Sequence, residues 1–295
     1  MPPKRIKQYE GRYALVDGIP YQMPVSARNS PAIMAGFTCN WEKANALLPG
    51  NEIHALKLPN GKAALLITVI DYVETSIGKY IEYSIAIGCT KGPKPAPRIL
   101  NSMLLKTYGT GQYILDLPVS SEVSVKGGKG IWGMPKHKAN LDFKITENSV
   151  SSQYEKDGQF VFRIEIERPK SPSIRLKVGA TNYCRFRNML MASYIYFDTK
   201  AGVNLFGKAK ANLYIGDHPY VSFLRDIEIN PDPFFTVFMP KTTGILDDHF
   251  ESWFMTYDEP PKEMPEGLES IVDLGLGEDW LPDPSITDYE KYRIR

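Results

Sequence analysis

The chain places its aromatic residues in short runs that glycine, proline, asparagine and aspartate interrupt. It contains 17 tyrosines and 13 phenylalanines, together with 23 glycines and 23 prolines. Aromatic and β-branched residues favour strands, and the interrupting residues favour turns. The pattern predicts a mainly β (α+β) fold: an antiparallel β-barrel or sheet with a few short helices.

The expected strands are apolar or alternating stretches that lie between turn signals. They cover residues 32–38, 63–72, 79–89, 111–118, 138–145, 159–167, 173–178, 194–197 and 209–215. Two helical segments are expected, one capped by Asn40 over residues 41–48, and a short turn capped by Ser120 or Ser121 that ends at Gly127 and Gly128. A late helix over residues 243–255 is also possible, because four apolar residues have helical spacing there: Leu246, Phe250, Trp253 and Phe254.

The domain organisation follows from a change in composition near residue 258. Residues 1–257 contain no linker-like stretch and no repeat, so we expect them to form a single domain. Residues 258–295 are rich in proline, aspartate, glutamate and glycine, with Trp280 and Leu281 as isolated apolar residues. They are interpreted as an acidic, proline-rich C-terminal arm.

Charge and hydropathy exclude several partners. The 35 basic and 34 acidic side chains leave a net charge of +1, which offers no footprint for nucleic acid. The longest apolar runs, such as residues 63–70, are too short to span a membrane, and we expect no membrane partner. The N-terminus lacks the apolar core of a signal peptide, so a cytoplasmic location is expected. Cys39, Cys89 and Cys184 show no metal or disulfide spacing and are interpreted as small buried side chains.

The common catalytic motifs are missing. The glycines at 109 and 111 and at 127–130 match neither a dinucleotide fingerprint nor a P-loop, and no G-x-S-x-G elbow is present. The four histidines form no HxH or HExxH pair, and no metal is expected. Chemistry must therefore come from another segment.

That segment is residues 126–138, KGGKGIWGMPKHK, where four glycines, a proline and a tryptophan surround four lysines. Neighbouring ammonium groups and burial both disfavour protonation, so a lysine here is a candidate for a neutral, nucleophilic amine. The alternative is a solvated basic loop.

The segment Trp132-Gly133-Met134-Pro135-Lys136-His137 resembles the aromatic-proline-lysine signature of the acetoacetate decarboxylase superfamily. Tyr80-Ile81-Glu82 is similar to the segment that supplies the family's active-site glutamate, and residues 209–219 resemble its late strands. The resemblance runs from about Ala32 to Trp253. It implies an acetoacetate-decarboxylase-like antiparallel β-barrel or sheet.

The resemblance implies that Lys136 is the nucleophile and that Glu82 positions groups or moves protons. The amine would attack a ketone to form an imine, which accepts the electrons released when a carbon–carbon bond breaks. The lysine imine then serves as the electron sink, and no cofactor is required. General acid–base catalysis by Glu82 would contribute roughly a hundred- to ten-thousand-fold.

Two departures from the family pattern change what is expected of substrate recognition. His137 stands where family decarboxylases have a second lysine, and Lys138 is a partial substitute in tuning Lys136. The family's substrate-binding arginine falls near Thr38, and only Arg28 lies close to that position. Trp132, Met134 and Tyr113 are candidates for the wall of the substrate pocket.

Strand alternation tests the two catalytic candidates. A regular strand over residues 135–145 would put Lys136 and Lys138 on one face and His137 on the other. Lys136 can react only if its face lines a closed cavity or a bulge resets the register. Glu82 shares its face with Ser84, Ala86 and Gly88, small residues that leave room for a ligand.

Three functions remain open. The first is an imine-forming lyase that acts on a keto acid, most simply a β-keto acid decarboxylase. The second is an imine-based aldolase or dehydratase, which the missing arginine and second lysine favour. The third is a non-catalytic barrel that binds a small apolar molecule. The expected partners are a small keto acid, ketone or aldehyde, and further copies of the chain in a homo-oligomer.

Overall fold

The computed structural model describes residues 10–97, 107–170 and 172–259. The helical elements are short: α2 (Trp41–Asn45), α3 (Glu122–Trp132), α4 (Phe223–Asp226), η1 (Phe206–Lys208) and η2 (Pro219–Val221). The first strands are β1 (Arg12–Val16), β2 (Ile19–Met23), β3 (Val25–Cys39), β4 (Ile53–Ala55), β5 (Ala63–Tyr72), β6 (Glu74–Thr75), β7 (Tyr80–Lys91) and β8 (Gly111–Val119). The later strands are β9 (Lys136–Lys138), β10 (Asn140–Leu141), β11 (Lys144–Ile145), β12 (Ser149–Lys156), β13 (Gln159–Glu167), β14 (Ile174–Phe186), β15 (Met189–Leu205), β16 (Ala211–Ile215) and β17 (Pro233–Phe254).

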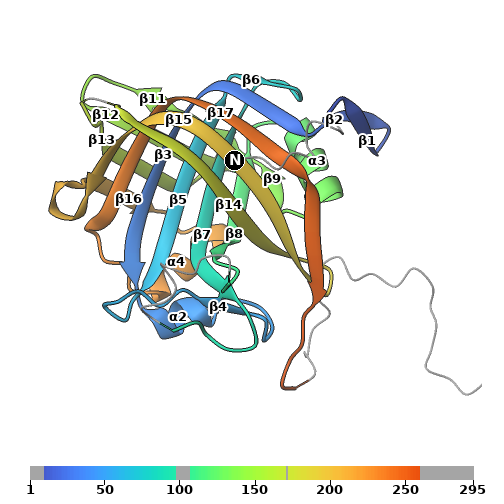
Figure 1. Ribbon diagram of the computed structural model, residues 1–295. Coiled ribbons are helices and arrows are strands. Elements are labelled where there is room, and N and C mark those ends of the chain that lie inside the picture. Colours follow the sequence, from blue (N-terminus) through green and yellow to red (C-terminus); the bar gives the residue numbers. More distant parts are fainter. Residues whose placement is uncertain (1–9, 98–106, 171, 260–295) are drawn as a thin grey trace, which may run out of the picture.

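The fold is mainly β, as the aromatic and turn pattern predicts. A ten-stranded sheet has the order β4-β7-β5-β3-β17-β15-β14-β8-β9, and β6 pairs with β3. Because β8 also pairs with β7, the hydrogen-bonded path returns on itself and surrounds an interior (Figure 1). The pairing is antiparallel except where β8 runs parallel to β14 and to β9. The expected mainly antiparallel β-barrel or sheet is confirmed, with β8 contributing the two parallel pairings.

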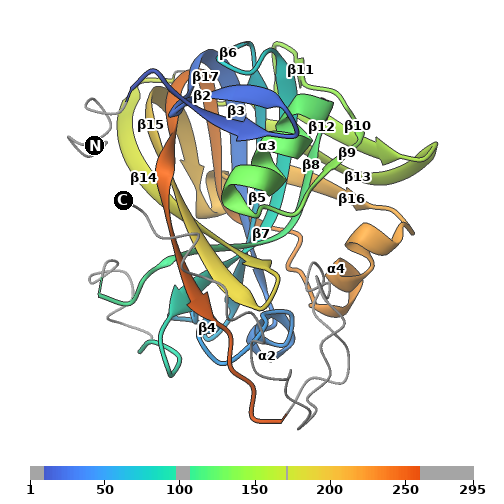
Figure 2. The same ribbon diagram turned by 90° about the vertical axis from the view of Figure 1, so that its right-hand side faces the viewer.

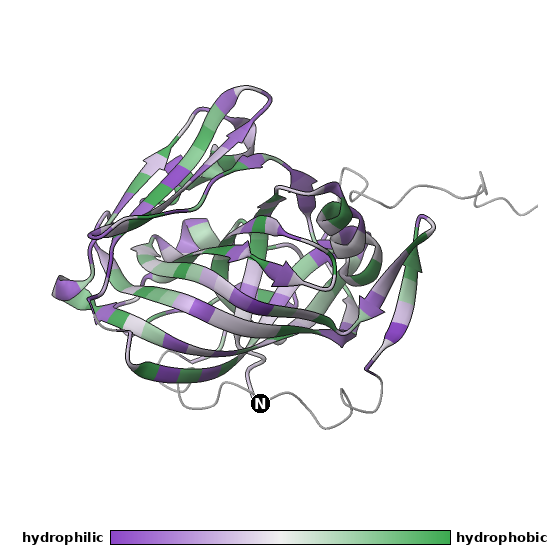
Figure 3. Ribbon diagram, turned by 90° about the horizontal axis from the view of Figure 1, so that it is seen from above, coloured by the Kyte–Doolittle hydropathy of each residue, from purple (hydrophilic) through white to green (hydrophobic). Residues whose placement is uncertain are grey.

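Alternation along the strands separates two environments. On β7, Glu82 and Ser84 face the interior of this sheet, whereas Tyr83, Ile85 and Ile87 belong to the main hydrophobic core outside it. The same alternation can be followed as green and purple segments along the strands in Figure 3. The expected separation of Glu82 and Ser84 from Tyr83, Ile85 and Ile87 on opposite faces of β7 is confirmed.

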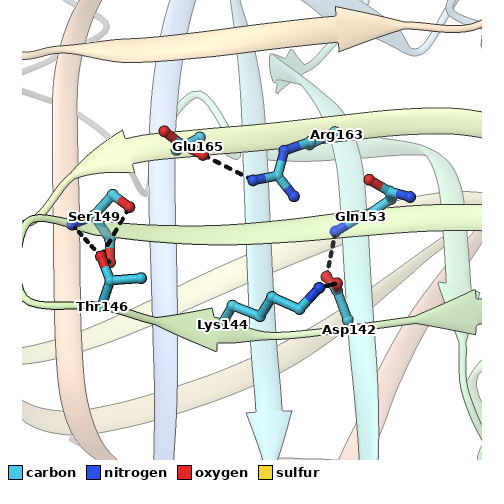
Figure 4. Close-up of polar contacts among 7 residues, drawn as sticks. All are labelled: Asp142, Lys144, Thr146, Ser149, Gln153, Arg163 and Glu165. Atoms are coloured by element: carbon cyan, nitrogen blue, oxygen red, sulfur yellow. Dashed lines mark hydrogen bonds and ion pairs between the residues drawn. The ribbon is translucent and has the colours of Figure 1, made fainter.

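A second sheet, with the order β10-β12-β13-β16, covers the outer side of β7. The Tyr83 ring lies 5.7 Å from the Phe162 ring and 6.2 Å from the Tyr154 ring, both measured between centroids. The outward side of this sheet is polar (Figure 4): Lys144 pairs with Asp142 at 2.7 Å, and Arg163 pairs with Glu165 at 2.7 Å. Apolar side chains are thus buried between the two sheets while charged groups stay in water.

The two larger helices lie at opposite ends of the main sheet, α2 at one end and α3 at the other (Figures 1 and 2). Asn40 caps α2 by accepting the Lys43 N–H, as expected. Ser121 caps α3 by accepting the Ser124 N–H, but α3 continues past Gly127 and Gly128 to Trp132, beyond the expected end. It packs beside β9 and the β1–β2 hairpin.

The helix suggested over residues 243–255 is wrong, because this stretch is the second half of β17. Leu246, Phe250 and Phe254 are spaced by four residues, which places them on one face of a helix and equally on one face of a strand. The pairing of β17 with β15 and β3 decides between the two. The strand expected at 138–145 is also corrected: it is broken into the ends of β9, β10 and β11.

Several other expectations concern single residues or the termini. Cys39, Cys89 and Cys184 are free and buried, as expected. Among the described residues, no helix is long and apolar enough to cross a membrane. The arm expected from residue 258 onward lies outside the described residues, apart from Asp258 and Glu259.

Candidate active site

The interior of the main sheet holds a cavity of about 100 Å³. All seven strands of the closed path contribute to its lining, as do β6 and β9. Most lining side chains are apolar or aromatic, and Glu82 and Lys136 are the only charged ones among the described residues. The two residues singled out as catalytic candidates therefore meet in one enclosed space.

Lys136 is the first residue of β9 and is 3% exposed. Its Nζ lies 2.6 Å from Glu82 Oε2 and donates to Ser124 Oγ at 3.0 Å. The Tyr80 ring centroid is 5.5 Å from the same nitrogen. A buried amine with a carboxylate in contact has a partner that can take its proton without bulk water.

Helix α3 fixes the path of the lysine side chain. A Cβ on Gly128 would lie 2.3 Å from Lys136 Cδ, so only glycine lets the helix backbone lie against the aliphatic chain. The helix then ends at Gly133, whose φ of 64° is the left-handed conformation that glycine tolerates. Met134 N–H donates to Gly128 O, and the chain turns directly into β9. Gly128 therefore allows close packing against Lys136, and Gly133 ends the helix just before β9.

Two tyrosines flank the ion pair inside the cavity. The Tyr72 and Tyr80 rings stack with centroids 4.6 Å apart, at the paired ends of β5 and β7. Burial, followed by the Glu82 carboxylate, raises the pKa of both hydroxyls well above their ordinary value. Both hydroxyls consequently stay protonated at neutral pH; Tyr72 is hydrogen-bonded to Glu82, and Tyr80 to Tyr72 and Ser124.

A neutral polar pair also lines the cavity. Gln112 Nε2 donates to Asn182 Oδ1 at 2.8 Å, joining β8 to β14. No arginine lines the cavity among the described residues. Arg28 is exposed on β3. The described lining therefore offers the neutral Gln112–Asn182 pair and no guanidinium group.

Sequence reasoning missed Ser124, Tyr72, Tyr80 and Gln112. Tyr80 carried a usable signal, because it precedes Glu82 by two residues and so shares its strand face. Ser124 precedes Gly128 by four residues, one helical turn away on the same face. Gln112 had no local signal, since its position depends on which strands pair.

His137 and Lys138 lie away from the cavity. His137 Nε2 contacts Asp116 Oδ1 at 2.7 Å, on the other side of β9, and the ring stacks on Tyr220 with centroids 4.3 Å apart. Lys138 is exposed. The charged group that faces Lys136 is thus the carboxylate of Glu82, and neither His137 nor Lys138 makes contact with its amine.

Of the other expected pocket residues, one lines the cavity and three lie outside it. Met134 lines the cavity, but Trp132 is buried behind it and donates its indole N–H to Asp247 O at 2.8 Å. Tyr113 points into the main core, while its neighbours Gln112 and Ile114 face the cavity. Thr38 pairs with Ala64 at the end of β3 and does not reach the cavity. Met34, four residues earlier on β3, lines it instead.

Comparison with known protein families identifies the family to which the chain belongs. The model of the acetoacetate decarboxylase family matches residues 9–195, more than half of the chain. The chain therefore belongs to the acetoacetate decarboxylase family, an enzyme family. No curated protein matched by sequence.

Solved structures show the same fold at low identity. Acetoacetate decarboxylase from Legionella pneumophila subsp. pneumophila str. Philadelphia 1 superimposes with a TM-score of 0.60 and 13% identity, covering 86% of this chain and 93% of that one. A second acetoacetate decarboxylase gives 0.58 and 12%, covering 79% and 91%. The enduracididine biosynthesis enzyme MppR with HEPES bound gives 0.56 and 11%, covering 78% and 88%. At these identities the likeness concerns the fold.

Proposed function

We propose that the chain is an imine-forming carbon–carbon lyase in which Lys136 is the nucleophile, and that its substrate is a small β-keto acid. One observation carries this proposal: Lys136, 3% exposed, ends in a mostly apolar cavity with the Glu82 carboxylate 2.6 Å from its nitrogen. A structural ion pair would not need an empty space beside it, whereas a nucleophile does.

The reaction begins with transfer of a proton from Lys136 to Glu82. The free amine then adds to the ketone carbon to give a carbinolamine, and loss of water, with a proton supplied by Glu82, gives an iminium ion. The bond to the carboxylate breaks, carbon dioxide leaves, and the electron pair moves to the iminium nitrogen as an enamine forms. Protonation of the enamine carbon and hydrolysis release the ketone and restore the amine.

The lining of the cavity supports decarboxylation. The substrate carboxylate would lie among apolar side chains, with the iminium as its only cationic neighbour, and would therefore be poorly solvated. Its departure as neutral carbon dioxide removes the free-energy cost of keeping a charge in this environment. The size of the cavity supports it too. An apolar cavity of about 150 Å³ accommodates benzene. The roughly 100 Å³ available here limits the substrate to a single small molecule.

Aldol condensation or dehydration through the same enamine is the second candidate, because an enamine that forms without loss of carbon dioxide can react with an aldehyde. The related fold of MppR was solved with pyruvate, with a TM-score of 0.52, and with the condensation product of pyruvate and imidazole 4-carboxaldehyde, with a TM-score of 0.50. A condensation must hold two reactants at once, for which the cavity is small.

Product analysis separates the candidates. The purified protein is incubated with acetoacetate, and separately with pyruvate plus acetaldehyde, with Lys136→Met as the matched inactive control. If the protein releases carbon dioxide from acetoacetate and forms no condensation product from pyruvate plus acetaldehyde, the result supports the decarboxylase. Condensation product without carbon dioxide release supports the aldolase. Absence of both products, with retained ketone binding, would leave the non-catalytic binding protein and overturn the proposal.

A further inference from the structure

A second pocket lies on the opposite side of β9 from Glu82. Its volume is about 380 Å³, within the ordinary range for small-molecule sites. The wall that separates it from the first cavity consists of Met134 and Lys136, which line both. Nothing in the proposed lyase chemistry uses this space.

The apolar part of the pocket comes from several elements. Leu115 on β8, Phe186 at the end of β14 and Pro135 before β9 form its walls. Gly133 belongs to the floor, and a Cβ there would lie 2.7 Å from Phe186 Cβ. These groups suit the body of a flat or aliphatic molecule better than a compact inorganic ion.

The charged part of the pocket is positive overall. Lys129 at the end of α3 and Arg185 on β14 line it, and neither has an ion-pair partner among residues 10–97, 107–170 and 172–259. Asp116, 2% exposed, is the only acidic lining residue in the same part of the chain, and it already contacts His137. Lys136 also lines the pocket but is paired with Glu82, so Lys129 and Arg185 against Asp116 leave the lining positive overall.

We propose that this second pocket binds a small organic monocarboxylate. The carboxylate pairs with Lys129 and Arg185 at the mouth, where a guanidinium can hold both oxygens, and the apolar body packs against Leu115, Pro135 and Phe186. The second pocket is the larger of the two, at about 380 Å³ against about 100 Å³ for the first cavity.

Calorimetric titration of the purified full-length protein tests the site with three probes: benzoate, neutral benzamide and inorganic phosphate. Benzoate should bind, benzamide should bind at least tenfold more weakly, and phosphate should not compete. The double variant Lys129→Ala/Arg185→Ala should weaken benzoate binding by about tenfold or more. Lys138→Ala, which removes an exposed charge nearby, is the matched control and should change binding less than twofold.

Two further results locate the ligand. Glu82→Gln alters the first cavity alone, since Glu82 does not line the second pocket, and it should change benzoate binding less than twofold; a larger change in that variant would place the ligand in the first cavity and overturn the proposal. Equal binding of benzamide, displacement by phosphate, unchanged binding in the double variant or no binding of benzoate would each overturn it as well. None of these binding measurements depends on whether Lys136 forms an imine.

Discussion

The two sides of β9 carry adjacent residues with opposite surroundings. Lys136 faces a small, nearly apolar cavity in which Glu82 is the sole charged neighbour among the described residues, whereas His137 faces Asp116, Tyr220 and a wider pocket with two unpaired cations. Strand alternation alone produces this separation. Proximity in sequence therefore does not make His137 part of the imine chemistry, and the charge that acts on Lys136 comes from β7.

The largest expected effect follows replacement of Lys136. Lys136→Met keeps the volume of the side chain but removes the amine, so turnover of acetoacetate should fall on the order of 10⁴-fold or more, as for loss of a catalytic nucleophile. Initial rates of carbon dioxide release measure this. Residual turnover within tenfold of the wild type would show that the reaction does not proceed through Lys136.

Glu82→Gln should produce the next largest effect. The amide retains the shape of the carboxylate but cannot accept a proton from Lys136, so kcat should fall by roughly 10²- to 10⁴-fold. Raising the pH should restore part of the rate, because hydroxide can then remove the proton. A rate that falls equally at all pH values would indicate that Glu82 only holds the lysine in place.

Gly128→Ala tests the packing of α3 against the lysine. The added methyl group would lie 2.3 Å from Lys136 Cδ, so either the helix or the side chain must move. We expect a loss of about 1–3 kcal/mol in the free energy of unfolding and a clear loss of turnover. Gly207→Ala is the control, because a Cβ at Gly207 meets nothing within 4 Å. Equal behaviour of the two variants in chemical denaturation would contradict the close packing.

His137→Gln should have the smallest effect on chemistry. The histidine lies on the far side of β9, so the pH dependence of kcat for acetoacetate should change by less than threefold at any pH. The Asp116 contact is lost, and stability should fall by about 1–3 kcal/mol. A shifted pH profile would show that His137 tunes the amine after all, and would remove the contrast between the two faces.

The parts of the site that could be predicted from sequence were those with a local signal. Alternation on residues 80–88 correctly separated Glu82 and Ser84 from the core residues Tyr83, Ile85 and Ile87. The same rule places His137 opposite Lys136, so the interpretation of His137 as a neighbour of the amine conflicted with the strand pattern. The structure gives no contact between the two side chains.

The rest depended on pairings that no local pattern encodes. Gln112 and Asn182 meet because β8 runs parallel to β14 over a short register. Tyr113 was expected in the pocket, but the strand places Gln112 and Ile114 there instead. In β17, apolar residues four apart fit either a helix or a strand, and only the long-range pairing with β3 and β15 settles which.

The most direct test of the central claim is reduction of the protein with borohydride in the presence of acetoacetate, followed by mass mapping of the peptides. The buried amine beside Glu82 predicts a stable mass increment on Lys136 alone, with none on the exposed Lys138 and none in the Lys136→Met variant. An unmodified Lys136, or an increment spread over surface lysines, would contradict an imine at this site.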